Sequence, residues 1–323
     1  MLSNYTIEQV PERNAKVREL LAAGVSYREI AKTLGIGIGT ISRIANAVVK
    51  RPEGTYSGNS GGLLDLADTP GLDLPHGYKD VEPPYEIEGK RIGVISDVHV
   101  PSHDKTALEA TLRYLKSEGI DTLLINGDYM DFYQISDHDK DKTRAITFGD
   151  ELETGRLILG QIRDYFGKGV AIVYQEGNHE ERYKRFLPQA MASDKVRGSS
   201  VPEQLDLLKY GITWVGNRRG CKAGKLMIYH GHEMRASGVN AAHNLITRLM
   251  DNVVIGHLHR PQSVQRPRMS GEAIGAWVSG CLCDLKPFYM PLNAWQHGFN
   301  IVTIDNTGMF RVQSKLVLNG EVF

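Results

Sequence analysis

The chain has 323 residues, of which 41% are hydrophobic and 24% charged, a composition typical of folded globular proteins. Its 38 basic and 38 acidic residues cancel, so the overall charge does not point to a nucleic-acid or membrane-surface partner. The three cysteines (Cys221, Cys281 and Cys283) exclude a disulfide framework and suggest free thiols in a reducing compartment, so we expect a cytoplasmic protein. No apolar run reaches the roughly 20 residues of a membrane span, and the N-terminus lacks a signal-peptide pattern.

The N-terminal part of the chain is basic and helical in pattern. Residues 1–51 carry eight Lys or Arg against four Glu, a net charge of +4, which leaves 30 basic against 34 acidic residues elsewhere. Pro11 suits a first helical position, and residues 26–29 form a capping box that opens a second helix. Ile41 and Ile44 continue the helical spacing, which predicts a third helix.

Residues 24–45 resemble a helix-turn-helix of the resolvase and transposase type. The resemblance implies that the third helix enters the major groove of DNA. The expected base contacts come from Thr40, Ser42 and Arg43, and the expected phosphate contacts come from Arg28, Lys32 and Lys50. A small helical module for dimerisation or for docking a protein partner would show the same pattern, so both readings stay open.

A linker is predicted next. Residues 52–86 hold six glycines and five prolines in 35 positions. A segment of this composition cannot bury enough apolar surface to fold independently. We therefore divide the chain into a helix-turn-helix domain (1–51), a flexible linker (52–86) and a larger domain (87–323).

Five apolar runs in the larger domain predict buried strands, and each is followed closely by Asp, Asn or His. Asp97 and His99 come directly after residues 91–96, and positions i and i+2 of a strand point to the same side. The other four runs and their followers are 122–126 with 127–131, 170–174 with 177–180, 226–229 with 230–232, and 253–255 with 256–259. Open α/β sheets place ligand sites at such carboxyl ends.

The spacing of these runs also predicts the fold. Helical segments at about 105–118 and 145–166 separate the first three runs, which implies parallel pairing through crossovers. The later runs 276–278, 299–304 and 309–318 predict a second, more antiparallel sheet beside the first. We therefore expect an α/β protein of the α+β type: a two-sheet β-sandwich flanked by helices and preceded by a small all-α domain.

The succession of motifs resembles the calcineurin-like metallophosphoesterase family. The matching elements span residues 92 to 259 in the family's order: 97–99, 127–131, 177–180, His230 and 256–259. The resemblance implies two divalent metal ions. The first would bind Asp97, His99, Asp128 and His259, and the second Asp128, Asn178, His230 and His257. Mixed oxygen and imidazole ligands suit Mn²⁺, our first choice, and also Fe or Zn²⁺.

The same resemblance assigns the catalytic groups. His179 would stabilise the transition state or protonate the leaving oxygen. Asp131 would orient it by accepting a hydrogen bond from its other ring nitrogen, with Glu180 as the alternative. Two further residues are weaker candidates. Arg182 would contact the substrate phosphate, and His232 would lie next to the site.

The function implied is that of a phosphoric ester hydrolase in which a metal-activated hydroxide attacks phosphorus. Together with the helix-turn-helix, this gives the leading hypothesis of a phosphodiesterase or nuclease acting on DNA. The chain after residue 51 is slightly acidic and so fits long DNA less well, which makes a nucleotide or small-molecule phosphoesterase, of phosphatase or cyclic-nucleotide type, an alternative. A DNA-binding regulator with an inactive phosphoesterase domain is another. The physiological substrate and the oligomeric state stay open.

Overall fold

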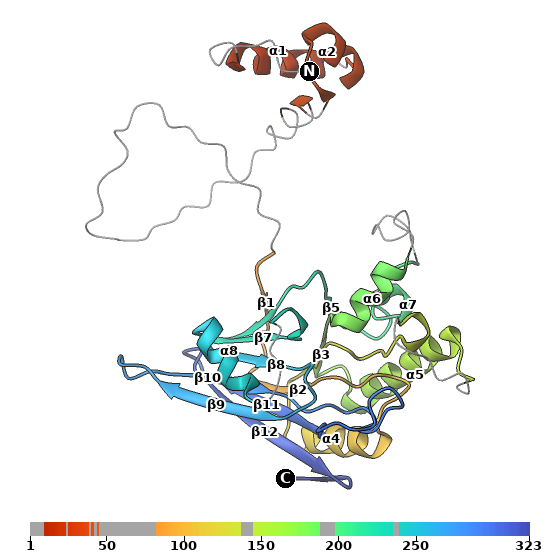
Figure 1. The fold of residues 1–323 in the computed structure, drawn as a ribbon, viewed down its shortest axis with the longest axis vertical. Coiled ribbons are helices and arrows are strands. Elements are labelled where there is room, and N and C mark those ends of the chain that lie inside the picture. The colour runs from red at the N-terminus through yellow and green to blue at the C-terminus, as the bar shows by residue number, and fades with distance from the viewer. Residues whose placement is uncertain are drawn as a thin grey trace. The chain divides into compact units, whose positions relative to one another are not determined.

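The computed structural model describes residues 10–23, 25–38, 40–41, 44, 82–136, 145–187, 198–234 and 239–323. The chain divides into two compact units, residues 1–77 and 78–323, which we describe separately (Figure 1). None of the helices within the described ranges combines the length and the apolar character that crossing a bilayer requires.

In the first unit, two helices pack around a small apolar cluster. They are α1 (Val10–Ala22) and α2 (Tyr27–Leu34). The capping box at the start of α2 is present, because the Ser26 and Glu29 side chains each accept a hydrogen bond from the other residue's backbone N–H. The buried side chains of the cluster are Val17, Ile30, Ile36, Ile41 and Ile44. Most of the third predicted helix lies outside the described residues.

The second unit contains two sheets. The seven-stranded sheet has the order β13-β12-β11-β2-β3-β4-β5, and the six-stranded sheet has the order β1-β6-β7-β8-β10-β9. The strands are β1 (Tyr85–Glu86), β2 (Arg91–Ile95), β3 (Thr122–Asn126), β4 (Ala171–Gln175), β5 (Ile212–Val215), β6 (Cys221–Ala223), β7 (Leu226–Tyr229), β8 (Val253–Ile255), β9 (Gln262–Pro267), β10 (Ala273–Val278), β11 (Gly298–Ile304), β12 (Phe310–Leu318) and β13 (Glu321–Val322). Within them, β2, β3, β4 and β5 run parallel, as do β7, β8 and β10.

Alternation along the central strands builds a layered core. Val94 of β2 packs with Ile228 and Val254 of the other sheet, whereas its neighbour Ile95 packs with Leu115 on the opposite face. That face is covered by α4 (Lys105–Ser117) and α5 (Phe148–Phe166), and α8 (Ala241–Leu249) covers the outer face of the six-stranded sheet (Figure 1). The expected two-sheet sandwich flanked by helices is therefore confirmed.

One detail of the sheet prediction is wrong. Residues 299–304 and 309–318 do not join the second sheet: β11 pairs antiparallel with β2, and β12 pairs with β11. The parallel crossovers β2-β3-β4 leave the other edge of β2 open, and an antiparallel strand satisfies the backbone groups exposed there. Residues 85–86, assigned to the linker from sequence, form a strand that pairs with β6.

Helices near the strand ends are short. The residues after β4 form α6 (Asn178–Phe186), and residues 188–197 lie outside the described ranges. Residues 205–209 form a run of turns that follows α7 (Val201–Gln204). Because α6 begins three residues after β4 ends, its first turn lies at the carboxyl edge of the seven-stranded sheet.

Candidate metal centre

The seven predicted metal ligands come from the carboxyl ends of five strands in both sheets. Asp97 and His99 follow β2, Asp128 follows β3, Asn178 opens α6 after β4, His230 follows β7, and His257 and His259 follow β8. The side chains meet because parallel strands end at the same edge of a sheet and the two sheets are stacked. The site therefore depends on the whole sandwich rather than on one loop.

The backbone at this edge is strained. Five of the seven residues have positive φ angles: Asp97 (56°), His99 (52°), Asp128 (50°), His257 (66°) and His259 (56°). Non-glycine residues in this region are uncommon, cost on the order of 1–3 kcal/mol each and cluster at functional sites. Here the loops after β2 and β3 brace each other, since Asp97 N donates to Gly127 O at 3.2 Å and His99 N to Asp128 O at 3.0 Å.

The side chains expected to hold the first ion lie around Asp97. Its Oδ1 is 3.1 Å from His259 Nε2 and 3.9 Å from His99 Nε2. The same His99 nitrogen is 4.0 Å from Asp128 Oδ2. All four side chains are buried, so these polar groups are shielded from water and interact with one another.

The side chains expected to hold the second ion lie around His230. Its Nε2 is 3.1 Å from Asp128 Oδ2 and 3.2 Å from Asn178 Oδ1. His257 completes the group, since it offers a ligand atom within 4.8 Å of those of Asp128 and His230. Asp128 thus lies between the two groups of side chains, the arrangement that a bridging carboxylate requires.

This donor set fits divalent metal ions. It combines carboxylate and amide oxygens with imidazole nitrogens, the mixture that Mn²⁺, Fe and Zn²⁺ bind. Two ring nitrogens, His99 Nε2 and His257 Nδ1, are buried and have no hydrogen-bond partner among the described residues. Unpartnered buried nitrogens are costly unless something binds them, and a metal ion would do so.

Electrostatic interactions at the site favour the charged form of most of its Asp and His side chains. Burial opposes ionisation of Asp97, but the neighbouring ring of His259 outweighs it and holds the Asp97 pKa far below its usual range. Burial likewise opposes charge on the imidazoles, yet Asp128 raises the pKa of His230 to about 10, and Asp97 raises that of His259 to about 9. His257 differs, because burial and the nearby His230 lower its pKa to about 4.

His179 lies beside the groups without being enclosed by them. Its backbone N donates to Asp128 Oδ1 at 2.9 Å, and its ring Nε2 is 3.7 Å from Asp128 Oδ2. The other ring nitrogen, Nδ1, donates to the backbone carbonyl of Asp131 at 2.6 Å. The ring is thus oriented by Asp131, but mainly through the carbonyl and not through the carboxylate, which lies 3.5 Å away. Arg182 Nη1 donates to the same carbonyl at 3.1 Å.

Glu180 does not orient His179, the alternative expected from sequence. Its fully buried carboxylate accepts hydrogen bonds from the backbone N–H groups of Asp128, Met130 and Gly177 and from the Tyr174 hydroxyl. These four bonds tie the loop after β3 to the start of α6. Glu180 therefore positions the backbone that carries Asp128 and Asn178.

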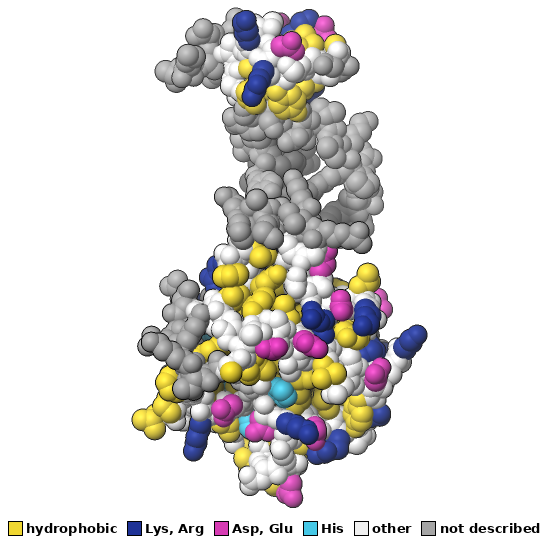
Figure 2. Space-filling model, turned by 90° about the vertical axis from the view of Figure 1, so that its right-hand side faces the viewer, with side chains coloured by type: hydrophobic (Ala, Val, Ile, Leu, Met, Phe, Trp, Pro, Cys, Tyr) yellow, Lys and Arg dark blue, Asp and Glu magenta, His cyan; other side chains and the backbone are white. Residues whose placement is uncertain are grey.

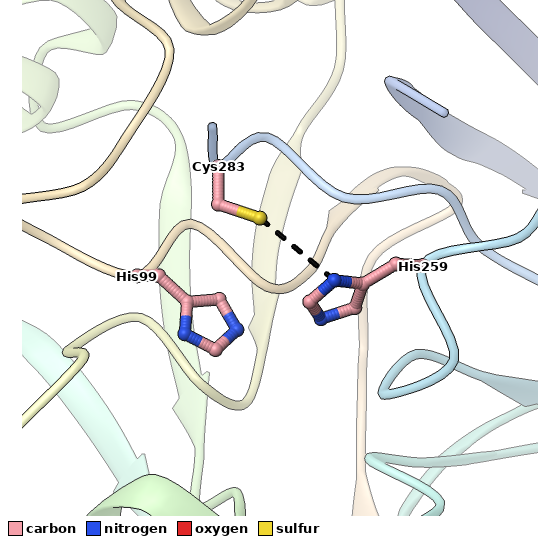
Figure 3. Close-up of side chains that lie close together, drawn as sticks. All are labelled: His99, His259 and Cys283. Atoms are coloured by element: carbon pink, nitrogen blue, oxygen red, sulfur yellow. Dashed lines mark hydrogen bonds between the residues drawn. The ribbon is translucent and has the colours of Figure 1, made fainter. Parts of the chain in front are cut away.

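Sequence reasoning missed three neighbours of the ligands. Ser96 Oγ donates to Asp97 Oδ2 at 2.6 Å. Cys283 Sγ lies 3.8 Å from His259 Nδ1, as the dashed line in Figure 3 shows, on the side of the ring away from Asp97. The Trp295 ring lies edge-on to His259, with 4.1 Å between centroids. Cys283 and Trp295 belong to the connection between β10 and β11, which carries no ligand motif, so only its cluster of aromatic residues could have drawn attention to it.

The remaining predicted residues are not part of this centre. The His232 ring is 5.6 Å from that of His230, and its Nε2 is 3.6 Å from Glu181. Of the expected DNA contacts in the first unit, Arg28 and Lys32 are exposed on α2 and Thr40 is half-buried. Ser42, Arg43 and Lys50 lie outside the described residues.

Two family models match parts of the chain. The model of the calcineurin-like phosphoesterase family matches residues 90–274, and the model of the Trp repressor protein matches residues 1–57. The first match covers all seven predicted ligands. The second is to a helix-turn-helix protein and does not single out the resolvase and transposase type.

Individual relatives are more distant. Two curated relatives, the gene 54 proteins of Mycobacterium phages L5 and D29, are 26% and 25% identical to this chain and cover 67% of it and 89% of their own length. Among solved structures, Vps29 of Entamoeba histolytica (16% identity, 72% of this chain and 96% of that one) has a TM-score of 0.37. The phosphoesterase Yfce of E. coli (14%, 69% and 98%) has a TM-score of 0.33.

Proposed function

Since the chain belongs to the calcineurin-like phosphoesterase family, we propose that its larger domain hydrolyses phosphodiesters of DNA at a pair of divalent metal ions. One observation carries the catalytic part of the proposal. Polar side chains from five strands of two sheets converge on Asp128, in a buried place where two of their ring nitrogens, His99 Nε2 and His257 Nδ1, have no hydrogen-bond partner among the described residues.

In this proposal the first ion binds Asp97, His99, Asp128 and His259, and the second binds Asp128, Asn178, His230 and His257. We propose Mn²⁺, with Fe or Zn²⁺ as alternatives. Two such ions, when bound, supply charge stabilisation for the phosphoryl oxygens and acidify a water molecule. The chain's own contribution is to hold the donors in place, through the bracing of the loops after β2 and β3 and through Glu180.

We propose that His179 is the group that donates a hydrogen bond or a proton to the leaving oxygen. Its Nδ1 is committed to the Asp131 carbonyl, so any proton transfer must occur at Nε2. That nitrogen lies 3.7 Å from Asp128 Oδ2, at the boundary of the metal centre, and the side chain is 13% exposed. A ring held in this way can donate a hydrogen bond or a proton to an ester oxygen bound beside the ions.

The DNA part of the proposal rests on the first unit. Its match to the Trp repressor model, the net charge of +4 over residues 1–51 and the exposed Arg28 and Lys32 on α2 support binding to the DNA backbone. A tethered DNA-binding module would raise the local concentration of phosphodiesters at the metal centre.

The test is Mn²⁺-dependent cleavage of end-labelled single- and double-stranded DNA by the pure protein, with His179→Ala prepared in the same way. Cleavage that disappears in the variant supports the proposal. If metal is bound and bis(p-nitrophenyl) phosphate is hydrolysed while both DNAs stay intact, DNA is not the substrate.

A small phosphoester is the second candidate. On the face drawn in Figure 2, basic and acidic side chains are interspersed over the larger unit, and long DNA prefers a surface of one sign. A cavity of about 530 Å³ beside the centre is also of a size that takes a small ligand. This candidate predicts turnover of nucleotides or aryl phosphates that is unaffected by removal of residues 1–77.

A further inference from the structure

We propose that the cavity beside the metal centre is a nucleobase-binding site, in which the base next to the reacting phosphate stacks on Phe288 in the loop between β10 and β11. This inference rests on the proposed function in one respect: it takes the phosphoester at the metal centre to carry a base.

The cavity is continuous with the metal centre. It has a volume of about 530 Å³, and its wall includes the predicted ligand His99 and also Asp131. A phosphoester held by the metal-binding side chains would therefore extend its organic group into this space. The volume falls in the range of known sites for small organic ligands.

Four aromatic side chains line the same cavity: Tyr133, Phe288, Tyr289 and Trp295. Trp295 packs on His259 with 4.1 Å between ring centroids, and Tyr289 packs on Trp295 at 6.3 Å. Phe288 is 69% exposed and Tyr289 39% exposed. Contacts between rings thus lead from a predicted ligand outward to Tyr289, and the exposed Phe288 is the preceding residue of the chain.

The loop between β10 and β11, which carries three of these rings, is fixed without burying Phe288. The Asn293 side chain donates to the carbonyls of Leu285 and Met290, both at 2.7 Å, and accepts from Trp295 N at 2.8 Å. Asp284 N donates to Ser102 O at 2.7 Å, which anchors the loop beside α4. Because the loop is already ordered, a ligand that covers Phe288 gains apolar contact at little entropic cost.

The polar groups of the cavity favour a base over a purely apolar ligand. Lys105 and Asp284 line it, and so does His103, whose Nδ1 is buried without a hydrogen-bond partner among the described residues. Nucleobases present both a flat face for stacking and an edge of donors and acceptors. Aromatic rings beside such groups are the usual means of holding unpaired bases.

The experiment compares two phosphates that differ only in the base. The full chain, loaded with Mn²⁺ and carrying His179→Ala to prevent turnover, is titrated with thymidine 5′-monophosphate and with 2-deoxyribose 5-phosphate in a calorimeter. We expect the nucleotide to bind at least about ten-fold more tightly, which is the effect of one stacked base. Adding Phe288→Ala should reduce that ratio about ten-fold, and Phe288→Tyr should preserve it.

A matched control comes from the same loop. Leu292 is 94% exposed and does not line the cavity, so Leu292→Ala should leave the ratio unchanged. Equal binding of the two phosphates, or a ratio that Phe288→Ala does not alter, would overturn the inference. Because the titration needs no DNA cleavage, a clear base preference in a protein that leaves DNA intact would refute the DNA substrate alone.

Discussion

At the scale of single residues, the role proposed for His179 is catalytic and does not include metal binding. Its Nδ1 donates to the Asp131 carbonyl and its Nε2 lies 3.7 Å from Asp128 Oδ2, so the ring touches the centre from its edge. We expect His179→Ala to lower kcat on a phosphodiester by about 10²- to 10⁴-fold, the contribution of a positioned acid. Metal content, measured by mass spectrometry, should stay the same.

The control for this variant is His243→Ala, which removes an imidazole from α8 on the outer face of the six-stranded sheet. It should retain both activity and metal. If His179→Ala instead loses one ion per chain, then His179 is a ligand, an arrangement compatible with its place beside His99 and Asp128.

Protonation of the imidazoles makes metal binding depend on pH. Although burial opposes their charge, Asp128 and Asp97 raise the pKa of His230 to about 10 and that of His259 to about 9 in the metal-free protein. Both rings are therefore protonated at pH 7, and a metal ion must displace these protons. His257, with its pKa lowered to about 4 by burial, has no proton to release.

Although burial opposes charge on His99, its contact with the Asp131 carboxylate raises the pKa of this ring as well. We therefore expect Mn²⁺ uptake at pH 7 to release at least two protons and its apparent affinity to rise as the pH increases toward 9. Calorimetry in buffers of different ionisation enthalpy measures the released protons directly. An affinity that is flat between pH 7 and 9, with no proton release, would contradict the assignment of His230 and His259 as ligands.

At the scale of elements, the turn after β3 shows how tightly backbone and ligands fit. Gly127 has φ 80°, and a Cβ at this position would overlap the ring of His230. Gly127→Ala should therefore displace His230 and abolish binding of one metal ion. Gly119→Ala is the matched control: its φ is 64°, yet no atom lies within 4 Å of the added carbon. Metal content should be normal in the control, and equal loss in both variants would show that backbone strain alone is responsible.

The joint between β3 and α6 depends on Glu180. Its carboxylate accepts three backbone N–H bonds and one from the Tyr174 hydroxyl. In Glu180→Gln the amide NH₂ must face at least one of these donors, so we expect a loss of about 2–4 kcal/mol in the free energy of unfolding and weaker metal binding. Urea unfolding measures the first quantity. Tyr174→Phe removes only one of the four bonds and should cost about 1 kcal/mol; a larger loss than in Glu180→Gln would refute this account.

The features that could be predicted from the sequence are local, and those that could not depend on contacts between distant parts of the chain. The strands that precede Asp97, Asp128 and His257 were predictable, because each is a short apolar run followed by a polar motif, and both are local features of the sequence. The pairing of β11 with β2 was not, because nothing in an apolar run identifies its partner strand. Cys283 and Trp295 escaped notice for a related reason: each reaches His259 only through the folded loop between β10 and β11.

At the scale of the whole molecule, the centre is made by two sheets together. β2, β3 and β4 provide one side of the ligand set and β7 and β8 the other. Bound ions would therefore link the two sheets. All seven predicted ligands lie within residues 78–323, and in the proposed function the first unit delivers the substrate to them.

Removing positive charge from α2 tests whether DNA binding and hydrolysis belong to different units of the chain. Arg28 and Lys32 are exposed on α2, and each phosphate contact adds about 0.9 to the steepness of the salt dependence of binding to duplex DNA. If both residues contact phosphates, Arg28→Ala/Lys32→Ala should weaken DNA binding and reduce the slope of log affinity against log salt by roughly 1.8. Turnover of bis(p-nitrophenyl) phosphate should not change, since the metal centre is untouched. An unchanged slope would mean that this helix does not face DNA and would favour protein docking by the first unit. A smaller slope with undiminished turnover would show that DNA binding and hydrolysis reside in separate parts of the chain.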